Sequence, residues 1–230
     1  MFYLNSLAGA NLPSCDKMIK NPYYTVCYNY ELKSPVVVSY ALTRSGATGR
    51  DIKKRMSFRV SREIPKKYRS SSRDYKNSGY DKGHLASDAS FDQTKKMLRS
   101  TYYYHNAVPM HRRVNRQYWL KAERFERLIA TVREAIIVTN IVIFDDDPDR
   151  MGKSEIAIPK GFYKVIETID GSYSRCFYYE NKEKLENDKL RDHLVEIPVM
   201  MEAIKKRIPH EYIIKESDNG GTDVSTSVSE

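Results

Sequence analysis

The chain has 230 residues, 40% of them hydrophobic, which fits one ordinary globular domain with its own core. Its 39 Lys and Arg residues outnumber the 30 Asp and Glu residues, and the formal charge of +9 favours polyanionic partners such as nucleic acid. No apolar run reaches the length of a membrane span, so no membrane-spanning helix is expected in this sequence.

The first residues and the cysteines bear on where the protein works. Residues 1–14 are expected to be an N-terminal extension. Met1 to Pro13 lacks a basic start and a continuous apolar run, so it is no convincing signal peptide, but it could be the remnant of an export segment. A disulfide between Cys15 and Cys27 would suit an exported protein. Reduced thiols in a cytosolic protein are the alternative, because the sequence has 3 cysteines and an odd count is no disulfide signature.

β-Branched and aromatic runs separated by turn residues predict several strands. The apolar run at residues 135–144 is typical of a buried strand, and Asp170-Gly171 predicts a hairpin. Short helices are expected at residues 90–98 and 199–208, and a disordered polar tail at residues 214–230. The predicted strands are residues 23–30, 36–43, 102–105, 135–144, 162–169 and 173–179.

A longer helix is predicted at residues 115–135, where Leu, Ala, Lys, Arg and Glu dominate and Pro and Gly are absent. An amide, a carboxylate and a guanidinium on one stripe could bind a hydrated cation and the anion that accompanies it. An ordinary amphipathic helix with surface ion pairs is the alternative. The apolar face is Tyr118, Ala122, Phe125, Ile129 and Val132, and the second stripe is Asn115, Trp119, Glu123 and Arg127.

Ahead of this helix lies the motif Asp81-Lys82-Gly83-His84. An imidazole near positive charge suits a general base that removes a proton from water beside a phosphate. Gly83 would allow a close backbone approach or an unusual dihedral angle. Alone, these four residues are a weak signal.

Together, these segments resemble the DNA/RNA non-specific endonucleases, the ββα-metal (His-Me finger) family of sugar-non-specific nucleases. That family carries Asp-Arg-Gly-His, then Asn-x-x-Pro-Gln, then Asn with Trp four residues later and Glu eight residues later. This chain has the first motif at residues 81–84, the second as Asn106-Ala107-Val108-Pro109-Met110, and then Asn115, Trp119 and Glu123. The resemblance covers roughly residues 15–209 and includes a later segment at residues 158–165.

The chain departs from the family pattern at several positions. Lys82 replaces the usual Arg, which keeps the charge but loses the bidentate fork. Met110 replaces the usual Gln, and Thr139-Asn140 stands where Thr-Gly is common. None of these changes removes the expected base or metal ligand, so they bear on rate and substrate handling more than on chemistry.

The resemblance implies an α+β fold with a mixed or antiparallel central sheet, packed helices and a ββα-metal site, in a single domain at residues 15–213. His84 is then expected to be the general base. Asn115 is expected to be the direct protein ligand of Mg²⁺, for which Mn²⁺ could substitute, and Glu123 to hold a water bound to the metal.

The remaining site residues are also implied by the resemblance. Asn106 is expected to order the site, and Arg127 and Arg55 to grip the phosphate. Arg59 is the second candidate for the arginine ahead of the motif, and a solvated loop is the alternative for the whole basic cluster at residues 53–59. The expected nucleic-acid contacts are Lys82, Arg55, Arg59 and Arg127.

The activity implied is metal-dependent hydrolysis of single- and double-stranded DNA, and of RNA, leaving 5′-phosphate ends. No base-reading element is recognisable, so little sequence preference is expected. A secreted or periplasmic protein is expected. The alternatives are a nucleic-acid-binding protein that has lost catalysis on the same fold, and a phage or toxin nuclease of narrower specificity.

Overall fold

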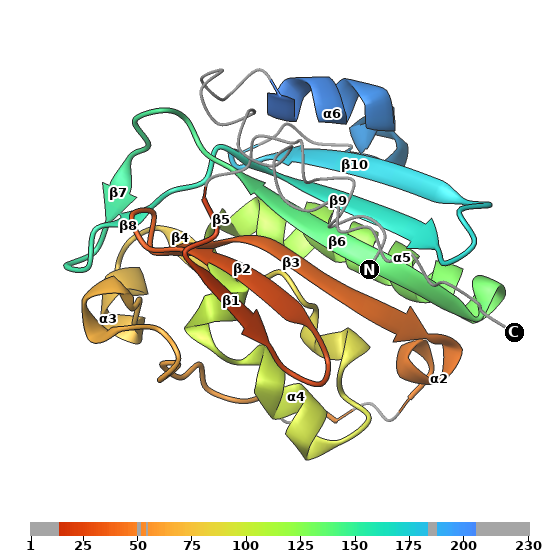
Figure 1. The fold of residues 1–230 in the computed structure, drawn as a ribbon, viewed down its shortest axis with the longest axis horizontal. Helices are drawn as coiled ribbons and strands as arrows, with labels where there is room; N and C mark the ends of the chain where they lie inside the picture. Colours follow the sequence, from red (N-terminus) through yellow and green to blue (C-terminus); the bar gives the residue numbers. More distant parts are fainter. Residues whose placement is uncertain (1–13, 50–51, 54, 184–187, 206–230) are drawn as a thin grey trace, which may run out of the picture.

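The computed structural model describes residues 14–49, 52–53, 55–183 and 188–205. Within that part, the main body is a seven-stranded sheet in the order β1-β2-β3-β6-β9-β10-β11 (Figure 1). Every neighbouring pair in this sheet is antiparallel. The α+β class with a central sheet and packed helices is therefore confirmed, with the sheet entirely antiparallel.

The elements follow each other along the chain in two stretches. The first comprises β1 Lys17–Lys20, β2 Thr25–Asn29, β3 Ser34–Thr43, α2 Arg44–Ala47, η2 Lys66–Tyr68, α3 Ser72–Tyr75, β4 Tyr80–His84, η3 Asp88–Ser90, α4 Lys95–Thr101 and η4 Tyr104–Asn106. The second comprises β5 Ala107–His111, η5 Val114–Trp119, α5 Leu120–Arg133, β6 Ala135–Ile143, β7 Arg150–Met151, β8 Ile156–Ala157, β9 Gly161–Thr168, β10 Ser174–Glu180, η6 Leu190–His193, β11 Leu194–Val195 and α6 Ile197–Lys205.

Side-chain alternation along the strands gives the sheet two buried faces. In β9, Phe162 and Ile166 belong to the larger core that includes α5, whereas Tyr163 and Val165 belong to a smaller core that includes Met200 of α6. Helix α5 runs along one face of the sheet (Figure 1), and α6 covers the other face near β10. Burial on both faces explains why polar and apolar residues do not alternate regularly along β6 and β9.

Most of the predicted strands are present, but two local predictions were wrong. Residues 102–105 form no strand, because the chain enters the 3₁₀ turn η4, and Tyr103 makes only an isolated bridge with Arg59. The helix predicted at residues 90–98 is instead the 3₁₀ turn η3 followed by α4. Residues 1–13 of the extension predicted at residues 1–14, and the tail predicted at residues 214–230, lie outside the described residues.

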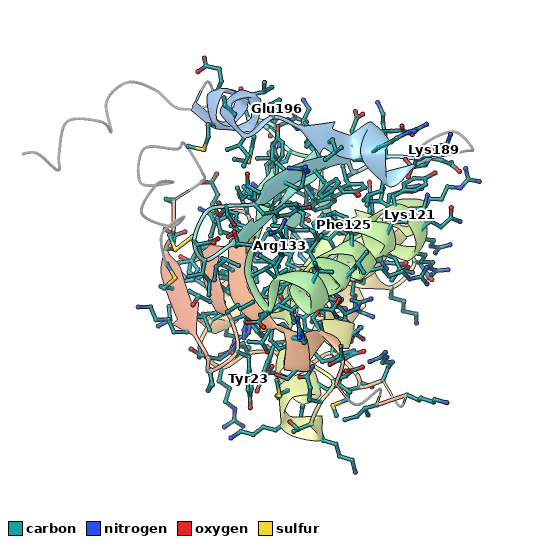
Figure 2. All side chains as sticks on the ribbon, turned by 90° about the vertical axis from the view of Figure 1, so that its right-hand side faces the viewer. Tyr23, Lys121, Phe125, Arg133, Lys189 and Glu196 are labelled. Atoms are coloured by element: carbon teal, nitrogen blue, oxygen red, sulfur yellow. A yellow bond between two sulfur atoms is a disulfide. The ribbon has the colours of Figure 1, made fainter. Side chains whose placement is uncertain are left out.

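The predicted long helix begins differently, and its buried face is only partly the predicted one. Residues 114–119 form the π-helical turn η5, and α5 starts at Leu120. Tyr118 and Ala122 lie in the core, and Phe125 and Ile129 pack against it, as predicted. Val132, predicted to lie on the buried face, is 64% exposed, while Glu126 is completely buried. Figure 2 shows Lys121, Phe125 and Arg133 spaced along α5 on the side that faces the viewer.

The three cysteines differ in their pairing. Cys15 and Cys27 form a disulfide in the structure, with their Cα atoms 5.2 Å apart, and it joins the start of the described chain to β2. Cys176 is buried and unpaired. Among the described residues, no helix is both long and apolar enough to cross a membrane.

Candidate active site

Strands β4 and β5 form a separate antiparallel pair, and η5 and α5 follow directly after β5. His84 lies opposite Ala107, and Tyr80 lies opposite His111. Alternation along β4 directs Lys82 and His84 to one face and Asp81 to the other. The strand with the histidine motif and the helix with the Asn115 stripe therefore belong to one local unit.

Gly83 has a packing role in this strand. Its φ is not in the left-handed region, because only Gly79, Gly152 and Gly171 have positive φ among the described glycines. A Cβ atom at Gly83 would lie 2.7 Å from the Cβ of Met110, which is completely buried. Of the two roles considered for Gly83, the unusual dihedral is absent, and the close approach is present because the Met110 side chain of β5 lies so near.

The ring of His84 is held between two aromatic rings. Its centroid lies 4.7 Å from that of Phe58 and 4.7 Å from that of Tyr102, which presents its edge. The Nε2 atom is buried and has no hydrogen-bond partner among the described residues. Burial lowers the pKa of His84 to about 4; nearby Arg55 acts in the same direction and Asp88 opposes it. The imidazole is thus neutral at pH 7 and able to accept a proton.

The residues that follow, 84–90, are called the His84 segment below. Asn106 holds its centre: Oδ1 accepts from the backbone N–H of Ala86 at 2.8 Å, and Nδ2 donates to the Ala86 carbonyl at 3.0 Å. The same Nδ2 also donates to the Thr101 carbonyl at 3.0 Å. Because Asn106 is completely buried, these bonds give it the means to order the segment.

Asn115 lies in the π-helical turn and is oriented by the histidine motif itself. Its Nδ2 donates to Oδ2 of Asp81 at 3.0 Å. Arg116 also binds Asp81, through Nε at 2.7 Å and a second guanidinium nitrogen at 2.9 Å. Hydrogen bonds from both residues lower the pKa of Asp81, against the effect of partial burial, which is the largest single influence and raises it. Since the amide nitrogen is engaged, the Asn115 side-chain oxygen is the atom left to bind a cation.

Glu123 and Arg127 lie on the flank of α5 that faces the His84 segment. Arg127 donates to Oγ of Ser87 at 3.4 Å. Burial raises the pKa of Glu123 to about 8; Glu126 and Asp88 act in the same direction, while Lys164 and Arg127 oppose them. The structure therefore places the Arg127 guanidinium against the His84 segment.

The basic residues ahead of the motif separate into two groups. The guanidinium of Arg55 lies 3.6 Å from Asp88 and 3.7 Å from Asp92, beside the His84 segment. Arg59 instead stacks over Tyr103 at 4.0 Å and donates to the Arg99 carbonyl at 3.3 Å. The geometry favours Arg55 over Arg59 as the phosphate-binding arginine.

Lys82 shares an aromatic surface with the histidine. Its Nζ lies 5.9 Å from the centroid of Phe58, the ring that also contacts His84. The positive charge that replaces the family's arginine is thus beside the base.

Asp88 is a site residue that the sequence did not indicate. Its Oδ2 accepts a 2.5 Å hydrogen bond from the Tyr102 hydroxyl, and it also pairs with Arg55. Asp88 therefore connects an aromatic ring that contacts His84 with the arginine expected to hold phosphate. No periodic pattern marks an aspartate four residues after a histidine, so only a structure could find it.

The donor atoms fit a hard cation that keeps most of its water. Among the described residues, no three His, Cys, Asp or Glu side chains gather as a metal site. The site offers instead one amide oxygen from Asn115, and Glu123 lies eight residues further along the same predicted helical stripe. Mg²⁺ prefers oxygen ligands and commonly retains several waters, so this sparse set is compatible with it.

A cavity of about 590 Å³ lies on the opposite flank of α5 and is separate from this site. Its lining contains neither His84 nor Asn115, and it is bordered by Phe125, Arg175, Phe177, Lys189, Leu190, Arg191 and Leu194. The cavity therefore adds nothing to the catalytic geometry.

Comparison with known proteins places the chain in a family. The family described as DNA/RNA non-specific endonuclease matches residues 6–209, which is most of the sequence, and the chain belongs to it. The resemblance seen in the separate motifs is thereby confirmed.

Individual relatives agree with this assignment. The chain is 24% identical over 170 residues to "Endonuclease G, mitochondrial" of Bos taurus, covering 70% of this chain and 57% of the relative. It is 32% identical over 154 residues to "Mitochondrial nuclease" of Saccharomyces cerevisiae, covering 61% of this chain and 47% of the relative. The chain thus spans about half the length of these curated relatives.

A solved structure shares the fold. It is titled "Crystal structure of the EndoG/EndoGI complex: Mechanism of EndoG inhibition", and the match has a TM-score of 0.75. It covers 88% of this chain and 89% of that chain at 22% identity.

The expected secreted or periplasmic location was wrong. Relatives from cattle, budding yeast and fission yeast are all named as mitochondrial nucleases. The expectation had rested on the possible Cys15–Cys27 pair and on an ambiguous N-terminus, and neither feature identifies a compartment by itself.

Proposed function

We propose that this protein is a Mg²⁺-dependent endonuclease that hydrolyses phosphodiester bonds of DNA, single and double stranded, and of RNA. The observation that carries the proposal is the coupling of the two expected functional groups through one strand. Asp81 of β4 fixes the Asn115 amide, and three residues later β4 ends at the neutral His84. A proton acceptor and a cation-binding oxygen are thereby supported by the same rigid unit.

In the proposed reaction, the imidazole of His84 accepts a proton from the water that attacks phosphorus. The P–O3′ bond breaks, the 3′ oxygen takes a proton from solvent water, and the product keeps a 5′-phosphate. Arg55 and Arg127 hold the phosphate oxygens and stabilise the negative charge that grows on them. Binding of phosphate would draw Arg55 away from Asp88 and Asp92, whose distances of 3.6 and 3.7 Å indicate loose pairing. Asn106 keeps the His84 segment fixed during these steps.

The cation would be held directly by the side-chain oxygen of Asn115, with Glu123 acting through water. When bound there, Mg²⁺ would supply positive charge that offsets the negative charge on the phosphate and on the leaving oxygen, and Mn²⁺ would substitute for it. Asp81 orients the ligand, and Arg116 keeps Asp81 ionised.

Phosphate contacts would dominate substrate binding, because the chain carries a formal charge of +9. Lys82, Arg55 and Arg127 lie near His84 and would contact the backbone, whereas Arg59 would contribute through the general positive field. Little sequence preference and 5′-phosphate products are expected. Since the relatives are named as mitochondrial, we also propose a mitochondrial site of action.

Incubation of supercoiled plasmid with the protein and Mg²⁺, with and without chelator, tests the proposal. Nicking and then degradation that stop when chelator is added are expected, and His84→Ala should lack both. A folded wild-type protein that binds DNA without cutting it would instead support the catalytically inactive alternative. A panel of DNA and RNA substrates would reveal a narrower specificity.

A further inference from the structure

A cluster of buried polar side chains lies between the sheet and α5, beneath the His84 segment. All of its members are at most 4% exposed, and they come from β3, η3, α5, β6 and β9. The buried polar network consists of Tyr40, Ser90, Glu126, Asn140 and Lys164.

An ion pair forms the centre of this network. Nζ of Lys164 lies 2.5 Å from Oε2 of Glu126, and both side chains are completely buried. Oε1 of Glu126 accepts hydrogen bonds from the Tyr40 hydroxyl at 2.7 Å and from Ser90 Oγ at 2.9 Å. The carboxylate is thus saturated by one cation and two hydroxyl groups.

Stability alone is a poor reason for such a pair. Removing two charges from water is costly, and well-packed apolar residues of similar volume often stabilise a protein equally well or better. The neighbours of Lys164 on the same face of β9 are Phe162 and Ile166, so an apolar side chain would suit the position. A reason for the charges must be sought in what they contact.

The network reaches the His84 segment at three places. Lys164 lies over the ring of Trp119 at 4.6 Å, and Nε1 of Trp119 donates to the His84 carbonyl at 3.1 Å. Asn140 donates to the Leu85 carbonyl at 2.9 Å, and Ser90 donates to Glu126. The network therefore holds His84 and Ser90, the two ends of the segment, and Leu85, the residue after the expected base.

The tie from Asn140 to Leu85 is the part of this arrangement that departs from the family pattern. Asn140 stands where the resembling family commonly has glycine, and glycine has no side chain with which to hold Leu85. Asn140 lies directly opposite Lys164 in the sheet, so the tie and the ion pair are neighbours.

We propose that the buried polar network, through the Glu126–Lys164 pair and Asn140, positions the His84 segment against α5 and so fixes the base relative to the Asn115 helix. The catalytic part of this inference rests on the proposed function. The positioning part does not, because it concerns the rigidity of the segment in the free protein.

The test replaces the charged pair by neutral side chains of similar volume, in Glu126→Gln/Lys164→Met. Hydrogen–deuterium exchange of the Leu85 and Ala86 amides measures opening of the segment, because both amides donate to Asn106, which lies outside it. Relative to the wild-type protein, exchange at Leu85 and Ala86 should accelerate by a factor at least roughly tenfold larger than the acceleration in β9. With Mg²⁺ and DNA, kcat should fall roughly 10- to 100-fold while KM changes less than about twofold.

A matched control exists on the other flank of α5, the side on which Figure 2 labels Lys121 and Phe125. There Nε2 of His193 lies 2.5 Å from Oδ1 of Asp188, both side chains are nearly fully buried, and Lys121 also contacts Asp188. Asp188→Asn/His193→Gln removes a comparable buried pair that does not contact the His84 segment. This control variant should have the wild-type kcat. Exchange of Leu85 and Ala86 should accelerate no more than exchange in the rest of the protein.

Asn140→Ala and Ser90→Ala each remove a single tie and provide the same measurements if the double variant does not fold. Selective acceleration at Leu85 and Ala86 supports the inference. Exchange that rises equally throughout the protein, or a folded variant with wild-type exchange and kcat, overturns it. If the wild-type protein cuts no substrate, the proposed function fails, and the exchange result still decides the positioning claim.

Discussion

The seven-stranded sheet and the His84 segment are stabilised by different kinds of contact. The sheet is a set of antiparallel strands whose buried residues are mostly apolar, with side chains such as Ile136, Val138 and Val142 in the core that includes α5. The His84 segment has little regular structure, and polar side chains hold it, among them Asn106, Asn140 and Trp119.

This difference has a consequence for mutations. Apolar contacts are non-directional, so losing one weakens the fold but leaves the remaining contacts in place. Hydrogen bonds from buried side chains are directional, so losing one releases a particular atom of the site. Changes to apolar side chains of the sheet should therefore alter stability, and changes to the polar side chains that hold the segment should alter activity.

The largest effect is expected for His84→Ala. Loss of a general base should lower the rate of DNA cleavage about 10²- to 10⁴-fold, whereas DNA affinity and Mg²⁺ affinity should remain nearly intact. Single-turnover cleavage together with binding titrations would measure this separation. Near-normal turnover by a well-folded His84→Ala protein would mean that His84 is only a packed residue.

The sheet should show the opposite behaviour. Ile136→Ala removes a completely buried side chain from the α5 face and should cost about 2–5 kcal/mol of unfolding free energy. The folded fraction should still cleave DNA within about twofold of the wild-type rate, since Ile136 has no polar tie to lose. Urea unfolding and cleavage below the transition would test both statements. A large fall in kcat would break the comparison.

A smaller effect is expected when the metal ligand loses its orienting partner. Asp81→Ala releases the Asn115 amide, and the Mg²⁺ concentration for half-maximal activity should rise roughly 10- to 100-fold. High Mg²⁺ should then recover much of the activity. Arg116→Ala is the control, because it leaves the bond between Asp81 and Asn115 in place. An equal rise in both variants would show that charge, and not orientation, is what matters.

The smallest effect concerns a histidine away from the site. Burial lowers the pKa of His105 to about 4, so the unfolded chain binds the proton more readily between pH 6.5 and pH 4. The contribution of His105 to the free energy of unfolding is therefore present above pH 6.5 and is lost as the pH falls through this window. The loss should be about 1 kcal/mol between pH 6.5 and 5.5. His105→Phe keeps a ring against Tyr103 and should flatten this slope. An unchanged slope would assign the acid sensitivity to other groups.

Sequence patterns predicted the sheet well because alternation and apolar runs reflect burial directly. The strand at residues 135–144 and the hairpin around Asp170 were recognisable in this way. The strand expected at residues 102–105 does not form, although its tyrosines favour strands. There the ring of Tyr102 packs against His84, and this tertiary contact outweighs local propensity.

The site could be predicted only as a set of residues, not as an arrangement. Family motifs indicated His84, Asn106 and Asn115, but no spacing shows that η5 is π-helical. No sequence pattern indicated that Glu126 and Lys164 are buried, because charged side chains are rarely buried in general. They are buried because each neutralises the other, and a pairing 38 residues apart in sequence leaves no periodic signal.

The most direct test of the account is whether a divalent cation binds beside His84. The rings of the 5 histidines can be labelled and observed by NMR while Mn²⁺, which broadens nearby signals, is added below stoichiometric amounts. The account predicts that the His84 ring signals disappear, that the His193 signals on the other flank of α5 persist, and that Asn115→Ala abolishes the effect. Persistent His84 signals with Mn²⁺ bound, or broadening that survives Asn115→Ala, would contradict it.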